Sequence, residues 1–382
     1  MLNILVLDSG TQGLIMVREL HKAGYRVVLL TCKDHNYADD SRYVDKKVIE
    51  KYDVSTEGYL HQVISVIKSE HISTIIPLGD KLAEFVSINK DVLLEYVKFL
   101  APDYDIFQSG YDKSKLMSIC QEYGYPHPFT ITGINSVEDI KETDVTFPLL
   151  IKPNITCGAR GMTLVDNFTQ LKEMLPLIQA EYGECHLQKY IRQGGAQVEV
   201  QLFLDRNHEL ISSSVIYKHR WYPEKGGSSC CAKSVVNNKI VGILHDLLRR
   251  IGWVGFADFD TIEDPDTGEL LIMELNPRVP ACVKTAFVAG INWAEIIVNG
   301  YLGLPQKEYH YKENEYLRHL GFEVLWFLKS PNRFNTYPNW FKFFGSNIHY
   351  QDMSDWSDPL PWIMGTLRNV KKVLLHEEKK KL

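Results

Sequence analysis

Two segments of the sequence decide the fold: Gly255-Phe256-Ala257-Asp258-Phe259-Asp260 and Leu270-Leu271-Ile272-Met273-Glu274-Leu275-Asn276-Pro277-Arg278. The residues Asp264-Pro265-Asp266-Thr267-Gly268 between them are typical of a turn, so the pattern predicts a β-hairpin. Asp266 is midway between Asp258 and Glu274 in the sequence, and a hairpin centred there places these two carboxylates opposite each other. Because side chains alternate along a strand, Asn276 shares a face with Glu274.

This hairpin is the predicted metal site. Like charges directly opposite each other destabilise a sheet, and a divalent cation between Asp258 and Glu274 would offset that cost. With Asn276 they offer hard oxygen ligands and no Cys or His, a set that suits Mg²⁺ completed by phosphates and waters. The alternative is a water-facing hairpin whose acids are simply exposed; the adjoining Arg278 favours the metal site.

A second motif lies upstream, at residues 147–162. An apolar strand ends in Lys152, and the loop after it contains Gly158, Arg160 and Gly161. A lysine at a strand end is a positioned charge, and a loop of small residues lets backbone N–H groups close over phosphate oxygens. This segment therefore predicts a phosphate site, with a hairpin carrying solvated cations as the alternative.

The first hundred residues read as strands that alternate with helices. Apolar runs at 3–7, 26–30 and 72–77 are separated by helical spacing, which predicts a parallel sheet of the doubly wound type. Gly10 and Gly13 follow the first run, but Asp8 stands where a dinucleotide fingerprint would have its first glycine. Two interpretations of this turn remain: an anion site at a helix N-terminus, or a turn that only needs a positive φ.

The pattern changes near residue 110. Strand-rich segments at 147–153, 162–165, 197–204, 255–261 and 270–275 predict an α+β body with antiparallel sheets. We predict domains at 1–108, 109–305 and 306–382. The last one is rich in aromatic residues, including Trp326, Trp340, Trp356 and Trp362. Core packing is the favoured interpretation of these tryptophans, and a surface for a lipid-linked or glycan substrate is the alternative.

Composition excludes several classes of protein. The 382 residues carry a formal net charge of −6, which lacks the basic footprint of a nucleic-acid-binding protein. No apolar run is long enough to span a bilayer. The seven cysteines are odd in number and scattered, so we expect free thiols and a cytoplasmic protein without a signal peptide.

Taken together, the motifs resemble the ATP-grasp superfamily, and most closely its biotin carboxylase and carbamoyl-phosphate synthetase branch and related carboxylate–amine ligases. The resemblance implies a mixed α/β and α+β fold. In it, a Rossmann-like pre-ATP-grasp domain precedes an ATP-grasp domain of two lobes, with a hinge near residues 188–191. It also implies ATP as cofactor, two Mg²⁺ ions that Mn²⁺ can replace, and a homodimer.

The resemblance also assigns roles to individual residues. Phosphate contacts are implied for Lys113, Lys152, Gly158, Arg160 and Gly161. Main-chain groups of Gln188, Lys189, Tyr190 and Ile191 would receive the adenine, and Glu199 would lie near the nucleotide and metal. The metal ligands would be Asp258, Glu274 and Asn276, and Arg278 would steady the anionic intermediate. The catalytic residues expected on this basis are Arg278, Lys152 and Arg160.

Three departures from the family pattern narrow the prediction. The segment Val279-Pro280-Ala281-Cys282 lacks the polar groups that follow the Asn-Pro-Arg motif in carboxylases, which argues against a biotin carboxylase. Gln188 replaces an acidic hinge residue, which leaves its role open. No second ATP-grasp half follows, so we do not expect a full carbamoyl-phosphate synthetase.

The expected reaction is attack by a substrate carboxylate on the γ-phosphate of ATP, followed by displacement of phosphate by an amine. An ATP-grasp kinase and a regulatory nucleotide-binding module remain as alternatives. Substrate selection is assigned to the turn at 8–13, Asp80 and the stretch 218–229. Within that stretch, Arg220 and Lys225 would meet a second carboxylate or be surface charges. His219 would be a base or an ordinary histidine.

Overall fold

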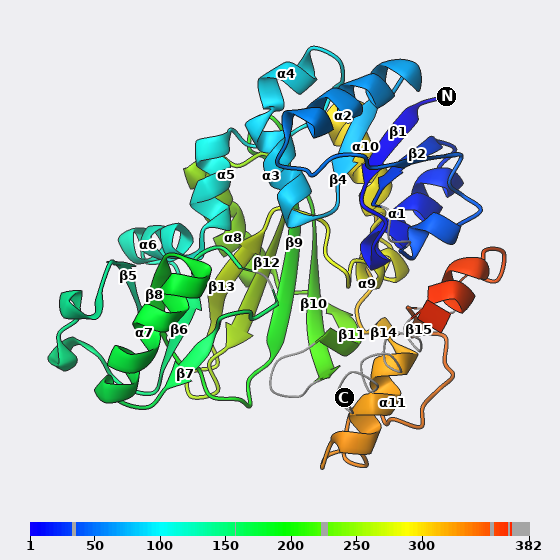
Figure 1. The fold of residues 1–382 in the computed structure, drawn as a ribbon. Coiled ribbons are helices and arrows are strands. Elements are labelled where there is room, and N and C mark those ends of the chain that lie inside the picture. Colours follow the sequence, from blue (N-terminus) through cyan, green and yellow to red (C-terminus); the bar gives the residue numbers. More distant parts are fainter. Residues whose placement is uncertain (33–35, 157, 223–227, 352–354, 366, 369–382) are drawn as a thin grey trace, which may run out of the picture.

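The structure is a computed structural model of residues 1–382. It describes every residue except 33–35, 157, 223–227, 352–354, 366 and 369–382. The described residues form three sheets, two of four strands and one of seven. Figure 1 shows the first sheet at the top of the molecule and the other two below it. None of the described helices is long and apolar enough to cross a membrane.

The first sheet is parallel, as predicted, with strand order β3-β2-β1-β4. Its strands are β1 (Asn3–Leu7), β2 (Arg26–Thr31), β3 (Lys46–Ile49) and β4 (Thr74–Pro77). The helices of this region are α1 (Thr11–Lys22), α2 (Glu57–Ser69), α3 (Asp80–Ile88) and α4 (Lys90–Leu94). Its core is continuous with α10 (Trp293–Leu302), which fixes the first sheet to the rest of the molecule.

The second sheet is small and antiparallel, with strand order β5-β8-β6-β7. Its strands are β5 (Thr130–Ile134), β6 (Leu149–Pro153), β7 (Thr163–Val165) and β8 (Cys185–Lys189). The helix α7 (Phe168–Tyr182) packs its buried leucines into the same core. The helices α5 (Tyr104–Tyr111) and α6 (Lys113–Tyr123) connect this sheet to the first one. Asp112 caps α6 by accepting from the N–H groups of Ser114 and Lys115, so Lys113 begins a helix as predicted.

The third sheet carries the predicted hairpin, with strand order β13-β12-β9-β10-β11-β14-β15. Its strands are β9 (Gln197–Leu204), β10 (Leu210–Tyr222), β11 (Ser228–Val235), β12 (Gly255–Glu263), β13 (Leu270–Asn276), β14 (Tyr316–Arg318) and β15 (Ile348–Tyr350). The helices α8 (Asn238–Ile251), α9 (Lys284–Val288) and α11 (Leu320–Lys329) belong to the same part of the chain. Because β14 and β15 come from the region after residue 305, that region extends this sheet.

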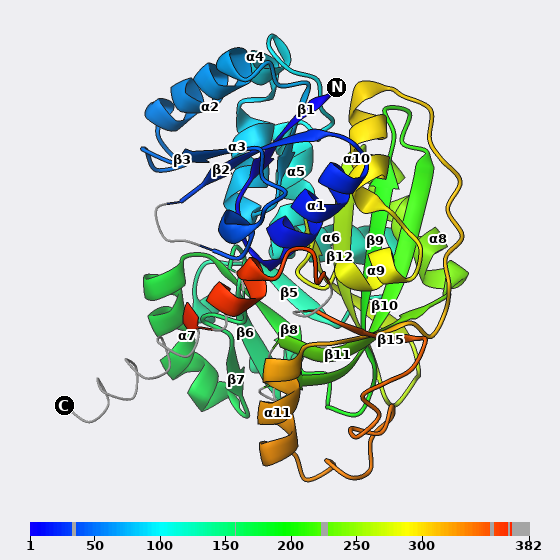
Figure 2. The same ribbon diagram turned by 90° about the vertical axis from the view of Figure 1, so that its right-hand side faces the viewer.

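The C-terminal region also reaches back to the first domain. Asp358 is buried and accepts from Arg18 Nε at 2.9 Å, from Ser41 Oγ at 2.7 Å and from the N–H of Arg42 at 2.9 Å. The segment that carries Asp358 lies beneath α1 in both ribbon views (Figures 1 and 2). A buried carboxylate with three donors is well satisfied, so this contact ties the chain's last described segment to α1.

The C-terminal tryptophans do not share one environment. Trp326 is buried, as core packing predicts, whereas Trp356 is 78% exposed. The described cysteines are free, in agreement with the prediction, and Cys157 lies outside the described residues.

Candidate nucleotide site

A cleft of about 470 Å³ lies between the small sheet and the large sheet. It is lined from one side by β6, the start of α6 and the loop after β6, and from the other by β9, β10, β12 and β13. The lining residues with polar or charged side chains are Lys113, Lys152, Thr156, Arg160, Gln197, Lys218, Asp260, Thr261 and Glu274. The two predicted motifs therefore face the same space.

Lys152 enters the cleft from the end of β6 and is 8% exposed. Its Nζ donates to Gln188 Oε1 at 3.0 Å. The pKa of Lys152 is lowered to about 8, mainly by burial and also by the charge of Lys113, against the opposing attraction of Glu274. An ammonium group that is poorly compensated by the protein is well suited to an anionic ligand.

The loop after β6 has the backbone that the glycines predict. Gly158, Ala159 and Gly161 have φ values of 65°, 58° and 73°. A Cβ on Gly161 would lie 2.8 Å from Pro153 Cγ, so glycine is required there for packing as well as for conformation. Lys113 Nζ donates to Thr156 O at 2.7 Å and holds the loop's base, and Arg160 is exposed at the cleft.

The expected adenine hinge lies beside the cleft and is not part of its lining. The side chain of Gln188 is fully buried and bonds Lys152, while the N–H groups of Lys189 and Tyr190 donate to Phe129 O and Pro148 O. The N–H of Ile191 has no acceptor among the described residues. Of the main-chain N–H groups at 189–191, that of Ile191 is therefore free to meet an adenine edge.

The hairpin exists, but its predicted register was wrong. Asp258 faces Asn276, and Asp260 faces Glu274. Near the turn, the residue pairs are shifted by one residue from the predicted pairing. A bulge between Asp260 and Thr261 shifts the pairs beyond it by one residue more. A shift of two residues preserves the face, so the four side chains still share one side of the sheet.

Asp260 is the functional candidate that the sequence analysis missed. It lines the cleft and accepts from Lys218 Nζ at 2.7 Å, and Lys218 also lies 2.9 Å from Glu199. Although burial would raise the pKa of Asp260, the neighbouring Lys218 holds it below its usual value. The alternation that paired Glu274 with Asn276 also pairs Asp258 with Asp260, so the signal was present in the sequence.

Asp258 lies deeper, at 1% exposure, and does not line the cleft. Its Oδ1 has no hydrogen-bond partner among the described residues, and its Oδ2 receives a long 3.4 Å contact from Asn276 Nδ2. Burial, with the charges of Glu199 and Asp260, raises the pKa of Asp258 well above its usual value. A buried, under-satisfied carboxylate beside three oxygen-bearing neighbours fits a site that gains from a cation.

Arg278 joins this site to the first domain. Its Nε donates to Asp80 Oδ1 at 2.9 Å, and its Nη2 lies 3.4 Å from Asn276 Oδ1. Burial would lower the pKa of Arg278, but Asp80 and Asp258 raise it above its usual value. Asp80, predicted to act in substrate selection, is therefore a partner of Arg278.

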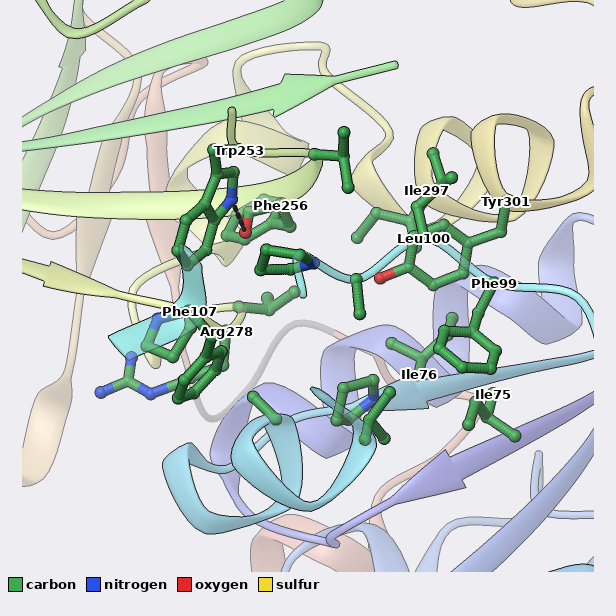
Figure 3. A pocket seen from close by; sticks show the side chains of 18 residues that line it. Ile75, Ile76, Phe99, Leu100, Phe107, Trp253, Phe256, Arg278, Ile297 and Tyr301 are labelled. Carbon is green, nitrogen blue, oxygen red and sulfur yellow. Dashed lines mark hydrogen bonds between the residues drawn. The ribbon is translucent and has the colours of Figure 1, made fainter. Parts of the chain in front are cut away.

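Behind Arg278 lies a small cavity of about 30 Å³ between the first and third sheets. Figure 3 shows the Arg278 side chain at one end of it and apolar side chains such as Phe99, Phe107 and Tyr301 around it. A volume of this size is about that of a single water, so the cavity has no room for a substrate.

The structure corrects several ideas on substrate selection. Arg220 is buried against Glu323 at 2.7 Å and does not reach the cleft. His219 packs against Tyr316 with ring centroids 5.9 Å apart, and burial lowers the pKa of His219 to about 4. Neither residue is placed to meet a substrate in this cleft, and Lys225 lies outside the described residues.

The turn after β1 is occupied by its own carboxylate. Asp8 has a φ of 88°, and its Oδ1 accepts from the N–H groups of Ser9 at 2.6 Å and Gly10 at 3.2 Å. Because Asp8 already takes these two donors, a turn is favoured over an anion site, but the positive φ lies at Asp8 and not at Gly10, whose φ is −61°.

The described side chains do not already converge as a metal site: no group of three or more His, Cys, Asp or Glu is close enough to hold an ion. The ammonium groups of Lys113 and Lys218 lie instead against Glu274, at 3.3 Å, and Asp260. The donor set is all oxygen and partly unsatisfied, so its chemistry fits a hard divalent cation delivered with phosphates.

Known proteins are similar to this chain in sequence and in fold. Residues 112–297 match the family described as carbamoyl-phosphate synthase L chain, ATP binding domain. The chain is 27% identical over 284 residues to the carbamoyl phosphate synthase large chain of Campylobacter jejuni, a match that covers 71% of this chain and 25% of that protein. The arginine-specific large chain of Bacillus subtilis is 24% identical over 287 residues, which cover 71% of this chain and 27% of that one. The chain thus spans about a quarter of the length of these curated relatives.

Solved structures agree on the fold. A biotin carboxylase from Campylobacter jejuni superposes with a TM-score of 0.69 at 19% identity, covering 82% of this chain and 74% of that one. An N5-carboxyaminoimidazole synthetase from Staphylococcus aureus complexed with ADP has a TM-score of 0.62 at 16% identity, covering 80% and 79%. An L-amino acid ligase from Bacillus licheniformis has a TM-score of 0.62 at 15% identity, covering 79% and 74%.

The sequence match and the shared fold agree with the ATP-grasp resemblance that the motifs indicate. Residues 112–297 are similar to the ATP-binding domain of the carbamoyl-phosphate synthase large chain.

Proposed function

We propose that this chain is an ATP-dependent ligase that activates a substrate carboxylate as an acyl phosphate for attack by an amine. One observation carries the proposal. Lys113, Lys152 and Arg160 line one side of a single cleft, and Asp260 and Glu274 line the other. Cations that disperse phosphate charge and carboxylates that hold a metal are what phosphoryl transfer requires.

In the proposed reaction, a carboxylate oxygen attacks the γ-phosphorus of ATP, and the bond to the β–γ bridging oxygen breaks to release ADP. The amine nitrogen then attacks the acyl carbon, phosphate leaves with the bonding electrons, and the nitrogen loses a proton. Lys113, Lys152 and Arg160 bind the phosphates and keep the γ-phosphate aligned. Arg278, fixed by Asp80, binds the charged oxygens of the acyl phosphate.

Magnesium ions, two in number and replaceable by Mn²⁺, belong to this proposal. Glu274 and Asp260 would hold them at the cleft, with Asp258 and Asn276 behind and Glu199 beside them. When bound, Mg²⁺ neutralises the developing charge on the phosphates. Lys218 and Lys113 now contact these carboxylates and would be displaced toward the phosphates.

The remaining parts of the proposal concern organisation. Residues 1–108 form the pre-ATP-grasp domain, 109–305 the ATP-grasp domain with its adenine hinge at 188–191, and 306–382 an extension that adds strands to the large sheet. The substrates are small molecules, one carboxylate and one amine. A homodimer is supported by a related 2-oxoglutarate carboxylase biotin carboxylase domain, which is described as a dimer in its complex with MgADP.

The test is release of ADP and phosphate from Mg-ATP with pools of carboxylates, each pool with and without pooled amines. Glu274→Gln should abolish release, and Glu269→Gln, an exposed residue of the same hairpin, is the matched control. Release that needs both a carboxylate and an amine supports the ligase. Release with a hydroxylated acceptor alone would identify a kinase, and Mg-ATP binding without release from any pool would contradict the proposed activity.

A further inference from the structure

A group of exposed apolar side chains lies on α11 and the loop that follows it, far from the first domain in Figure 1. Four of its apolar side chains are largely exposed: Leu328 at 62%, Phe334 at 68%, Phe341 at 56% and Phe344 at 90%. We call these four residues the aromatic patch. Exposing so much apolar surface costs hydrophobic free energy, and such patches mark interaction sites.

The aromatic patch is built on fixed rings. Phe327 contacts Phe334 and Phe341 with ring centroids 5.5 and 5.6 Å apart, and it packs on Trp340 at 4.2 Å. Phe334 and Phe341 stack on each other at 6.5 Å. Because the rings support one another, they are held outward in a preformed arrangement.

Buried charges hold the loop beneath the aromatic patch. Arg318 donates to the carbonyl oxygens of Lys342 and Trp340, at 2.7 and 2.8 Å, and Arg220 donates to that of Pro338 at 2.8 Å. Glu323 pairs with both guanidinium groups, at 3.0 and 2.7 Å, and all three ionic side chains are buried. The loop is therefore fixed through its backbone, and its side chains remain free to face outward.

The segment that carries the aromatic patch has charged side chains of one sign only. From Val324 to Gln351 the sequence has no Asp or Glu and has Lys329, Arg333 and Lys342, although the chain as a whole carries a net charge of −6. Lys329 and Lys342 are exposed, and Arg333 lies over the Phe334 ring at 5.8 Å. A second copy of this surface would place like charges against like, which disfavours a symmetric dimer here.

We propose that the aromatic patch docks the protein on the surface of an anionic lipid bilayer, with the rings at the interface and the cations against the headgroups. Aromatic residues are favoured at the water–membrane boundary, and basic residues beside them add attraction to anionic lipid. This is binding to a surface and needs no spanning helix, in keeping with the helices described.

Flotation with vesicles tests the proposal, with one-to-one phosphatidylcholine and phosphatidylglycerol against phosphatidylcholine alone. The full chain should float with the anionic vesicles, and high salt should weaken binding. Lys329→Gln/Lys342→Gln should lower partitioning about fivefold for each lysine removed. Phe334→Ser/Phe341→Ser should lower it about tenfold or more.

Matched controls remove equivalent exposed groups elsewhere. Lys141→Gln/Lys239→Gln should leave partitioning unchanged, and so should Ile88→Ser/Leu177→Ser. Failure of the full chain to bind anionic vesicles would overturn the proposal, as would equal losses in the control variants. A dimer in light scattering that dissociates in Phe334→Ser/Phe341→Ser but not in Ile88→Ser/Leu177→Ser would instead assign the surface to a second copy and overturn the proposal too.

Discussion

Two pairs of buried, positively charged side chains in this molecule serve different purposes: one pair lines the candidate nucleotide cleft, and the other holds the fold together. Lys113 and Lys152 line an open cleft, while Arg220 and Arg318 lie under α11. The arginines share the carboxylate of Glu323 and donate to several carbonyl oxygens, whereas Lys152 has one acceptor among the described residues, the neutral Gln188. Burial alone therefore does not identify a functional cation. What distinguishes Lys152 is incomplete compensation next to space that a ligand can enter.

The largest expected effect lies on the structural side of this comparison. Glu323→Gln leaves Arg220 and Arg318 buried without a counter-charge, so it should lower the free energy of unfolding by about 3–5 kcal/mol. Urea unfolding at pH 7 measures this change, and Glu57→Gln, at an exposed site, should stay within about 0.5 kcal/mol. An equally small effect of Glu323→Gln would mean that the carbonyl contacts alone hold the arginines.

Replacement of a lysine in the cleft should have the opposite effect: activity should fall while the fold stays stable. Lys152→Met removes an ammonium group aimed at phosphate, and turnover should fall by about 10²–10³-fold. Stability at pH 7 should rise rather than fall, because the methionine keeps the apolar stem and removes the cost of a buried ammonium group. Steady-state kinetics and urea unfolding of the same preparation separate the two quantities. A variant that unfolds easily but whose folded fraction is fully active would contradict the proposed difference between Lys152 and the two buried arginines.

The sequence could predict the parts of the site that are local. Lys152, Gly158 and Gly161 come from one strand and its loop, and both hairpin strands were predicted because alternation and turn residues act over a few positions. The register of the hairpin could not be predicted, because neither the pairing at the turn nor the bulge beside Asp260, each of which shifts the register by one residue, has a clear sequence signal.

The role of Arg220 could not be predicted from the sequence, for a different reason. Its partner Glu323 lies 103 residues later, and only the tertiary fold brings the two together. A second bulge in β10, between Lys218 and Arg220, also breaks the alternation that would have placed both on the cleft face. The parallel strands of the first domain could be predicted, because apolar runs that alternate with helical segments are compatible with few other folds.

A smaller effect tests the corrected register. Asp260→Asn should raise the Mg²⁺ concentration needed for half-maximal turnover about tenfold, because it removes a carboxylate that faces Glu274 across the hairpin. Titration of Mg²⁺ at saturating ATP measures this shift, with Glu269→Gln as the unaffected control. If the Mg²⁺ concentration for half-maximal turnover does not change, the metal would instead be assigned to the deeper pair, Asp258 and Asn276.

The smallest expected effect is a pH dependence of stability at Lys152. Burial lowers the pKa of Lys152 to about 8, from an ordinary value of 10.5. Between these values the unfolded chain binds more protons than the folded one, so this residue makes stability rise as the pH increases from about 8 to 10. Below that window both states are protonated and the buried charge is a constant cost.

Lys152→Met isolates this contribution, because the other groups titrate alike in both proteins. The free energy of unfolding of the wild type, relative to the variant, should increase across that window and be level below it. Saturating Mg-ATP should shift the increase to higher pH, since bound phosphate favours the charged lysine. A difference that stays level with pH would show that Lys152 is already compensated in the free protein, and the contrast with Arg220 and Arg318 would then lose its basis.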